Sequence, residues 1–321
     1  MSVERMLMEA KSGDGISDAL AKKLLNVPLN ELCRAANEVR ENRCGTAFDL
    51  CSIINAKSGL CSENCSFCAQ SSSHNAHVRQ YPLLTGEELF EAALKAKKSG
   101  ILRFSIVTSG GALSSKEIDS VCKAVEKIRS EADISVCLSL GLLSEAQFRL
   151  LHSAGAERIH NNLESSKGYF PKICTTHSWE EKCEAIKAAQ SAGLTVCSGG
   201  IIGLGEEPED RIAMVSAIRA LGVKSIPVNI LNPIPGTPLE NMKPLPYEEL
   251  LRTIAIFRLM LPDSAIRLAG GRALLPEHGE ACFLSGANAA ITGNMLTTTG
   301  PSAQSDIMRL KNLGYEVKDI D

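Results

Sequence analysis

The sequence predicts a (β/α)8 barrel with an N-terminal helical extension. Eight apolar runs rich in β-branched residues recur along the chain, and seven segments with helical periodicity lie between them. A barrel of this kind typically takes about 250 residues, so the 321 residues leave room for an extension. We expect the extension over residues 1–45, which carry two helix-like patterns, and the barrel over residues 46–321. The competing layout for the same alternation is a doubly wound sheet.

The expected strands are short apolar runs bounded by turn residues. In chain order they are Phe48–Asn55, Leu102–Val107, Ile134–Leu140, Arg158–Leu163, Thr195–Ile201, Ser225–Leu231, Ala265–Ala269 and Ala289–Gly293. The expected helices are Gly86–Ser99, Ser115–Ser130, Ser144–Ser153, Ser178–Ala192, Glu207–Leu221, Tyr247–Met260 and Glu277–Ser285. Several begin at a Ser or Thr that can cap a helix, and glycines suited to a left-handed end residue follow four of them: Gly100, Gly155, Gly193 and Gly222. The Pro-rich stretch Asn232–Pro246 is expected to form a long loop on the face where a barrel carries its site.

Composition and charge exclude several classes of protein. With 34 basic and 37 acidic residues the net charge is −3, which argues against a surface that binds nucleic acid. Met1–Gly15 lacks the apolar core of a secretion signal, and no apolar run reaches the length of about eighteen residues that a membrane helix needs. We therefore expect a cytoplasmic protein with no membrane partner. In that reducing compartment the 12 cysteines favour metal ligation, catalysis or burial as small hydrophobes over disulfides.

Three of these cysteines follow the first expected strand at close spacing. Cys61, Cys65 and Cys68 form a C-x3-C-x2-C motif. Three thiolates on one loop can hold three irons of a cubane cluster and leave the fourth iron open to an exogenous amino acid. The alternative is a structural zinc site or three incidental cysteines, but neither His74 nor His77 forms a familiar second half of a zinc site.

The motif, with the aromatic Phe67 before its last cysteine, resembles that of the radical S-adenosylmethionine (SAM) superfamily. The resemblance implies a [4Fe–4S] cluster on Cys61, Cys65 and Cys68 that binds SAM. One electron then cleaves SAM to methionine and a 5′-deoxyadenosyl radical, which abstracts hydrogen from an unactivated carbon. The cofactor carries this chemistry, and the protein positions it and excludes competing reactions.

Further stretches narrow the resemblance to the biotin synthase family over nearly the whole chain. They are Cys197–Glu206, Pro227–Pro233, Gly236–Leu239, Ile266–Arg272 and Gly286–Asn288. The resemblance implies sulfur insertion between C6 and C9 of dethiobiotin, an electron donor such as flavodoxin or ferredoxin, and a homodimer. The alternatives are a radical SAM enzyme related to hydrogenase maturases or to an enzyme of pyrrolysine synthesis, and a non-catalytic iron–sulfur scaffold.

The resemblance also implies a second iron–sulfur cluster, which supplies the sulfur. In the usual pattern a [2Fe–2S] cluster is held by three cysteines and an arginine, and the matching positions here are Ser105, Cys137, Cys197 and Arg267. A neutral serine is a poor iron ligand. Our hypothesis is a larger, sulfur-rich cluster of the [4Fe–5S] kind on four cysteines, with Arg267 as a nearby cation: Cys44, Cys51, Cys137 and Cys197. In the alternative interpretation Cys44 and Cys51 are buried small hydrophobes, as is expected for the remaining cysteines Cys33, Cys122, Cys174, Cys183 and Cys282.

The resemblance assigns further residues to SAM and to the substrate. Those expected at SAM are Phe67, Gly110, Asn162, Glu164, Lys182, Gly200, Ile202 and Gly203. A carboxylate such as Glu164 suits the ribose diol because it accepts two hydrogen bonds. Asn162 and Asn229 are expected to contact the ureido ring of dethiobiotin, although His160 replaces an Asn of the usual pattern. Lys182 either binds the SAM carboxylate as a point charge or belongs to a solvated helix face. Arg103 and Arg267 lie on strands that line the barrel, so we expect both to face anions, with cluster sulfides or the SAM and dethiobiotin carboxylates as the candidates.

Overall fold

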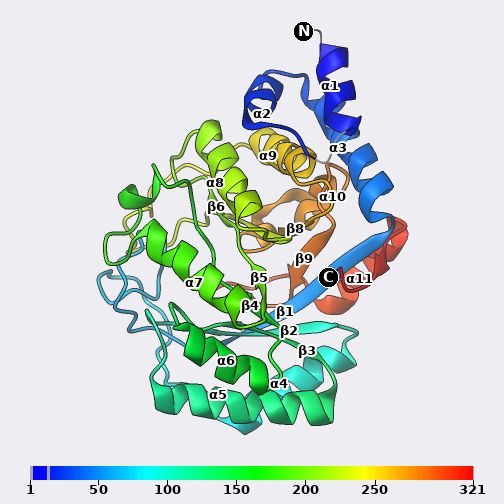
Figure 1. Cartoon of the computed structure of the whole chain (residues 1–321). Helices are drawn as coiled ribbons and strands as arrows, with labels where there is room; N and C mark the ends of the chain where they lie inside the picture. Colours follow the sequence, from blue (N-terminus) through cyan, green and yellow to red (C-terminus); the bar gives the residue numbers. More distant parts are fainter. Residues whose placement is uncertain (1–2, 13–14, 321) are drawn as a thin grey trace.

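The computed structural model describes residues 3–12 and 15–320. Its barrel strands are all parallel: β1 (Ala47–Lys57), β2 (Arg103–Thr108), β3 (Ser135–Ser139), β4 (Arg158–His160), β5 (Thr195–Cys197), β6 (Gly200–Ile202), β7 (Ser225–Ile230), β8 (Ala265–Leu268) and β9 (Ala289–Thr292). β1 pairs with both β2 and β9, so the sheet closes on itself. This closure confirms the (β/α)8 barrel and excludes the doubly wound sheet, which is open (Figure 1).

The fifth barrel position is split into β5 and β6, where the sequence predicts one continuous strand. β5 pairs with β7 at Ser225, and pairing resumes at Val228 with β6. Pro227 lies between these two points and has no N–H to donate to a neighbouring strand. Gly199 lies opposite, where a Cβ would stand 1.9 Å from the Pro227 carbonyl oxygen. The ladder therefore breaks at a proline and a glycine that allow close backbone contact.

The expected helices form around the barrel. They are α4 (Gly86–Lys98), α5 (Ser115–Lys127), α6 (Glu145–Ser153), α7 (Trp179–Ser191), α8 (Pro208–Ala220), α9 (Tyr247–Met260) and the short α10 (Glu280–Phe283). α4 to α7 begin with capping boxes, in which the N-cap side chain and the third helical residue bond reciprocally: the N-caps are Thr85, Ser114, Ser144 and Ser178. Gly100, Gly155, Gly193 and Gly222 each follow a helix end with positive φ, as predicted. α5 continues into a π-helical turn at Ile128–Ala132.

Three helices precede the barrel, although the sequence predicts two. They are α1 (Val3–Ser12), α2 (Asp18–Leu24) and α3 (Leu29–Cys44); α2 lies beside α8 and α9, α3 lies beside α9, and α1 packs on α3 (Figure 1). Pro28 separates α2 from α3, because a proline disfavours helix in the residue before it and suits a helix start. α3 packs over α9, whose residues Thr253–Met260 are all buried between the barrel and this extension.

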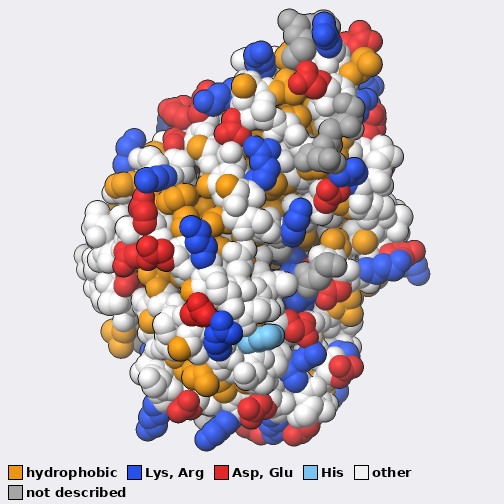
Figure 2. Space-filling view, in the orientation of Figure 1, with side chains coloured by type: hydrophobic (Ala, Val, Ile, Leu, Met, Phe, Trp, Pro, Cys, Tyr) orange, Lys and Arg blue, Asp and Glu red, His pale blue; other side chains and the backbone are white. Residues whose placement is uncertain are grey.

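The chain ends in two elements that the sequence does not predict. α11 (Ala303–Asn312) leads to the two-residue strand β10 (Glu316–Val317), which pairs with the first residues of β1. Acidic and basic side chains are interspersed over the face drawn in Figure 2, in agreement with the near-neutral charge. Within residues 3–12 and 15–320, no helix combines the length and the apolar character needed to cross a membrane.

Candidate active site

A cavity of about 400 Å³ opens at the carboxyl ends of the barrel strands, a size that suits a small molecule. Successive strand residues point to opposite faces, and the inward residues are odd-numbered on most strands. Those that line the cavity from the strands are Cys51, Ile53, Arg103, Ser105, Val107, Thr108, Cys137, Ser139, Arg158, His160, Cys197, Ile201, Asn229, Ile230, Arg267 and Ile291. Five positions that the sequence assigns to the second cluster therefore share one cavity: Cys51, Ser105, Cys137, Cys197 and Arg267.

The loop after β1 brings Cys61, Cys65 and Cys68 to the same cavity. Backbone hydrogen bonds fix this loop: Cys61 N–H donates to the Gln70 carbonyl at 3.0 Å, and Cys68 N–H donates to the Cys65 carbonyl at 2.9 Å. Burial raises the pKa of the Cys68 thiol to about 11. Three sulfur donors on one short loop, all facing one cavity, fit a cubane cluster with one iron left for an exogenous ligand.

Cys51, Cys137 and Cys197 line the base of the barrel from β1, β3 and β5. Burial raises the pKa of Cys51 and raises that of Cys137 to about 12. Burial also acts to raise the pKa of Cys197, but the hydrogen bond with His160 and the nearby arginines outweigh it and lower the pKa to about 6. Ser105 lies beside Cys137 in the β2–β3 register. Three buried thiols facing one another across the barrel fit a second group with soft ligands.

Charged side chains, mostly buried, surround the base of the cavity. Arg267 pairs with Asp49 at 2.9 Å, and its Nη1 lies 3.2 Å from the Cys51 sulfur. Arg158 stands 3.8 Å from the same carboxylate, and Arg103 pairs with Asp319 at 2.5 Å. Arg103 and Arg267 thus face anions, but these are the protein carboxylates Asp319 and Asp49 rather than the cluster or ligand groups that we expect from the sequence. Three buried arginines lie at the base of the cavity, and all three act on the buried Asp49.

The structure does not bring Cys44 to this cavity, which corrects the four-cysteine hypothesis. Cys44 ends α3, and its sulfur lies 3.6 Å from the Pro262 carbonyl and 3.4 Å from Arg258. These neighbours belong to the segment around the end of α9, where α3 packs. Cys51 is among the described residues that line the cavity, and Cys44 is not.

Most of the residues expected at SAM line the cavity: Phe67, Gly110, Asn162, Glu164 and Lys182. Glu164 holds a left-handed φ of 67°, and burial raises the pKa of its carboxyl group. The Lys182 Nζ lies 3.3 Å from the Asn161 Oδ1, so its side chain turns inward rather than to a solvated helix face.

The side chains expected from β6 are placed differently. Ile201 lines the cavity, whereas the Ile202 side chain is fully buried in the main core. Gly200 and Gly203 are also absent from the described lining. For Ile202 the reason is the strand period of two, since an error of one residue in the expected position moves a side chain to the other face of the sheet. Gly200 packs closely instead, because a Cβ there would stand 2.3 Å from the Glu164 carbonyl oxygen.

Both asparagines expected at the substrate line the cavity and hold neighbouring backbone. The Asn229 amide accepts from Gly270 N–H at 2.9 Å and donates to the Gly200 carbonyl at 3.2 Å. The Asn162 Oδ1 accepts from Gly199 N–H at 3.1 Å. They therefore join the ends of β4, β6, β7 and β8 around the cavity.

Two structural features were missed from the sequence. Glu206 is buried, and its carboxylate accepts from Gly203 N–H at 2.9 Å and Leu204 N–H at 2.7 Å while pairing with Arg211 at 2.7 Å. An acidic residue three positions after a glycine at a strand end was the available signal. The second feature is the pair Cys174 and His177, which lie against Cys65.

Comparisons with known proteins agree with this site. Residues 57–218 match the radical SAM superfamily, and residues 227–316 match the biotin and thiamin synthesis associated domain. The chain is 50% identical over 318 residues to a biotin synthase of Brachyspira hyodysenteriae, covering 99% of this chain and 96% of that protein. It is 48% identical over 306 residues to a biotin synthase of Clostridium botulinum, covering 95% and 96%.

Solved structures share the fold at lower identity. A methylornithine synthase aligns with a TM-score of 0.84 at 21% identity, covering 98% of this chain and 97% of the other. A maturase of the [FeFe]-hydrogenase aligns with a TM-score of 0.84 at 18% identity, covering 97% and 74%. These matches support the barrel alone, whereas identity near 50% over almost the full length identifies the family. The chain belongs to the biotin synthase family of the radical SAM superfamily.

Proposed function

We propose that this chain converts dethiobiotin into biotin by inserting sulfur between C6 and C9. One observation carries the proposal: the loop cysteines 61, 65 and 68 and the barrel cysteines 51, 137 and 197 line a single cavity. A radical generated at the cavity mouth and sulfur held at its base would then meet one substrate between them. The 50% identity to a biotin synthase supports the same substrate.

The residues at the mouth suit the first cofactor pair, a [4Fe–4S] cluster and SAM. Cys61, Cys65 and Cys68 would hold the cluster, which when bound supplies the electron that cleaves SAM to methionine and a 5′-deoxyadenosyl radical. Glu164 would accept two hydrogen bonds from the ribose diol, and Lys182 would face the SAM carboxylate. Phe67 offers an aromatic face for adenine. The remaining residues that we assign to SAM are Asn162, Gly110 and the β6 backbone at Gly200, Ile202 and Gly203.

The base of the barrel suits a second iron–sulfur cluster. Cys51, Cys137 and Cys197 would be its ligands, with Arg267 as a ligand or as a neighbouring cation, and the cluster would be a [2Fe–2S] or a larger sulfur-rich cluster. Thiolates are soft ligands that iron–sulfur clusters prefer. Arg267 acts to lower the pKa values of Cys51 and Cys197, but burial keeps those of Cys51 and Cys137 above the usual value, so these two thiols would lose their protons on binding the metal.

Asn162 and Asn229 are proposed as the contacts of the ureido ring between these two groups. Each amide offers both a donor and an acceptor, which matches the N–H and C=O groups of a urea. Their backbone hydrogen bonds fix the side chains in place before substrate arrives.

We also propose a flavodoxin or ferredoxin as electron donor, a homodimer, a cytoplasmic location, and residues 1–45 as an extension of the barrel 46–321. The family resemblance supports the first two. The 12 cysteines, all free, suit a reducing compartment and support the third, and the packing of α3 on α9 supports the fourth.

The test is anaerobic reconstitution with iron and sulfide, followed by SAM, a reductant and dethiobiotin, with products followed by mass spectrometry. We expect 5′-deoxyadenosine together with biotin or a thiol derivative of dethiobiotin. Cys61→Ala should abolish both products. If 5′-deoxyadenosine forms while dethiobiotin stays intact, the radical chemistry stands and the substrate assignment is wrong.

A further inference from the structure

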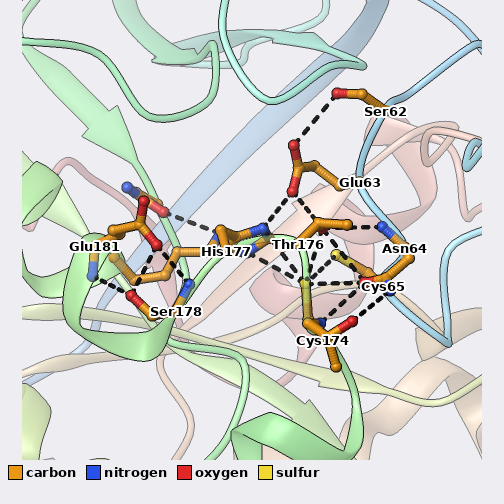
Figure 3. A network of polar contacts seen from close by, with 12 residues as sticks. Ser62, Glu63, Asn64, Cys65, Cys174, Thr176, His177, Ser178 and Glu181 are labelled. Atoms are coloured by element: carbon orange, nitrogen blue, oxygen red, sulfur yellow. Dashed lines mark hydrogen bonds and ion pairs between the residues drawn. The ribbon is translucent and has the colours of Figure 1, made fainter.

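The segment 173–178, which connects β4 to α7, lies along the loop that carries Cys65 (Figure 3). Ser66 N–H donates to the Ile173 carbonyl at 2.8 Å, and Thr175 N–H donates to the Asn64 Oδ1 at 3.0 Å. The Asn64 Nδ2 donates in turn to the Thr175 Oγ1 at 2.7 Å. Hydrogen bonds in both directions therefore hold the two segments in one register.

This contact brings three potential metal ligands together. The Cys174 sulfur lies 3.7 Å from the Cys65 sulfur and 3.4 Å from the nearest ring nitrogen of His177. One ligand atom from each of the three residues lies within 4.8 Å of the others. Around a tetrahedral Zn²⁺, with Zn–S near 2.3 Å and Zn–N near 2.0–2.1 Å, ligand atoms stand about 3.4–3.8 Å apart. The separations of Cys174 from Cys65 and from His177 match a tetrahedral site, and the third, between Cys65 and His177, is at most 4.8 Å and closes with a small side-chain movement.

Glu63 contacts the same histidine. Its Oε2 lies 2.6 Å from the His177 Nδ1 and accepts from the Thr176 hydroxyl at 2.5 Å (Figure 3). A carboxylate that accepts the Nδ1 proton leaves Nε2 as the lone-pair donor, and this Nε2 lies 3.8 Å from the Cys174 sulfur. Such carboxylate–histidine pairs orient the imidazole ligand at zinc sites.

We propose that the chain without its [4Fe–4S] cluster binds one thiophilic divalent ion, Zn²⁺, through Cys65, Cys174 and His177. Binding replaces the two thiol protons, which pass to solvent, and water takes the fourth position. The site itself stands on these side chains alone.

The effect of zinc on cluster loading rests on the proposed function, in which Cys65 is also a ligand of the [4Fe–4S] cluster. Zinc and cluster then exclude each other, and at nitrogen and sulfur ligands Zn²⁺ binds more tightly than Fe²⁺. Zinc at this site therefore blocks cluster loading.

The binding test uses Co²⁺ as a spectroscopic probe on the full chain, purified without iron and then titrated with Zn²⁺ to displace the cobalt. We expect one equivalent of Co²⁺ with the thiolate-to-cobalt absorption of a tetrahedral site. Cys174→Ser and His177→Gln should each lose that absorption, and Glu63→Gln should weaken binding about 10–100-fold. Cys183→Ser is the matched cysteine control and should bind as the wild type does, while circular dichroism checks that every variant is folded.

A double variant separates this site from the cluster loop. Cys61→Ser with Cys68→Ser removes the other two loop thiols and should keep the cobalt absorption. If the double variant loses it, or if Cys174→Ser keeps it at wild-type affinity, the ion sits on the loop cysteines and the proposal is wrong.

The competition is measured by iron and sulfide content after reconstitution with added Zn²⁺. We expect Zn²⁺ to lower the cluster content of the wild type and to lower that of Cys174→Ser much less. Equal loss in both would overturn the exclusion. A failure of the proposed function would appear differently, as a reconstituted wild-type chain that forms no biotin or thiol derivative of dethiobiotin while the cobalt results hold.

Discussion

The guanidinium Nη1 of Arg267 lies 3.2 Å from the Cys51 sulfur at the base of the barrel, and the same guanidinium pairs with Asp49 at 2.9 Å. β8 and β1 supply these residues from opposite sides of β9. The guanidinium acts to lower the pKa of the Cys51 thiol, although burial outweighs it and raises that pKa, and it places a positive charge beside the thiolate that forms when a metal binds. This makes Cys51 the strongest candidate for the thiol that replaces the one missing at Ser105.

Cys51→Ala should therefore lower the iron and sulfide of the second cluster while the first cluster still assembles. The chain offers a matched control, because Cys44→Ala removes a thiol that lies outside the cavity at the end of α3. We expect Cys44→Ala to keep the full iron and sulfide content, measured after anaerobic reconstitution. Full second-cluster content in Cys51→Ala would show that Cys51 is only a buried hydrophobe.

The pair of Asp49 and Arg267 predicts a stability effect that needs no cofactor. Both side chains are about 2% exposed, and removing Arg267 takes away the nearest partner of Asp49 but leaves it Arg158 at 3.8 Å. Arg267→Met should therefore lower the free energy of unfolding, by less than the roughly 3–5 kcal/mol that a buried charge left without any partner costs, measured by urea denaturation of the cluster-free chain. Asp49→Asn combined with Arg267→Met should recover part of this loss. Additive losses in the double variant would mean that the two residues are not coupled.

The barrel and its inward residues follow from local rules, which explains why they could be predicted. Side chains alternate between the two faces along each strand, and this rule alone places Cys51, Cys137, Cys197 and Arg267 on the inner face of the barrel. The prediction for Cys44 was wrong because the position of this residue depends on where α3 packs. Cys44 is seven residues before Cys51, but α3 ends at Cys44, so this spacing does not say where the Cys44 side chain lies relative to the barrel.

The features that were missed depend on contacts between distant segments. Cys174 meets Cys65 across 109 residues of sequence, and no local pattern marks that encounter. Ile201 and Ile202 show the other limit, since both are apolar and the break at Pro227 restarts the strand register. Composition alone does not decide which of the two faces the cavity.

Glu164 predicts a pH dependence of SAM binding. Burial raises the pKa of this carboxyl group, and only its ionised form accepts two hydrogen bonds from a diol. SAM affinity should therefore fall as the pH is lowered through that raised pKa. Equilibrium dialysis of the reconstituted chain across pH measures the effect.

Glu164→Gln is the control for that titration, because an amide does not ionise and SAM's own groups titrate equally in both proteins. The variant should bind SAM more weakly at high pH and show a flatter pH profile. Parallel profiles for the two proteins would assign the pH dependence to another group.

The buried carboxylate of Glu206 stabilises the turn after β6. It accepts from the backbone N–H groups of Gly203 and Leu204 and pairs with the buried Arg211. Glu206→Gln keeps the size of the side chain but removes the charge, so the free energy of unfolding should fall by about 1–3 kcal/mol. SAM binding should also weaken, because Gly203 lies in the turn proposed to approach the cofactor. Glu209→Gln, at an exposed position in the first turn of α8, should leave both quantities unchanged. Urea denaturation measures the free energy of unfolding, and equilibrium dialysis measures SAM affinity. If Glu206→Gln loses stability but binds SAM normally, the turn at Gly203 is not part of the cofactor site.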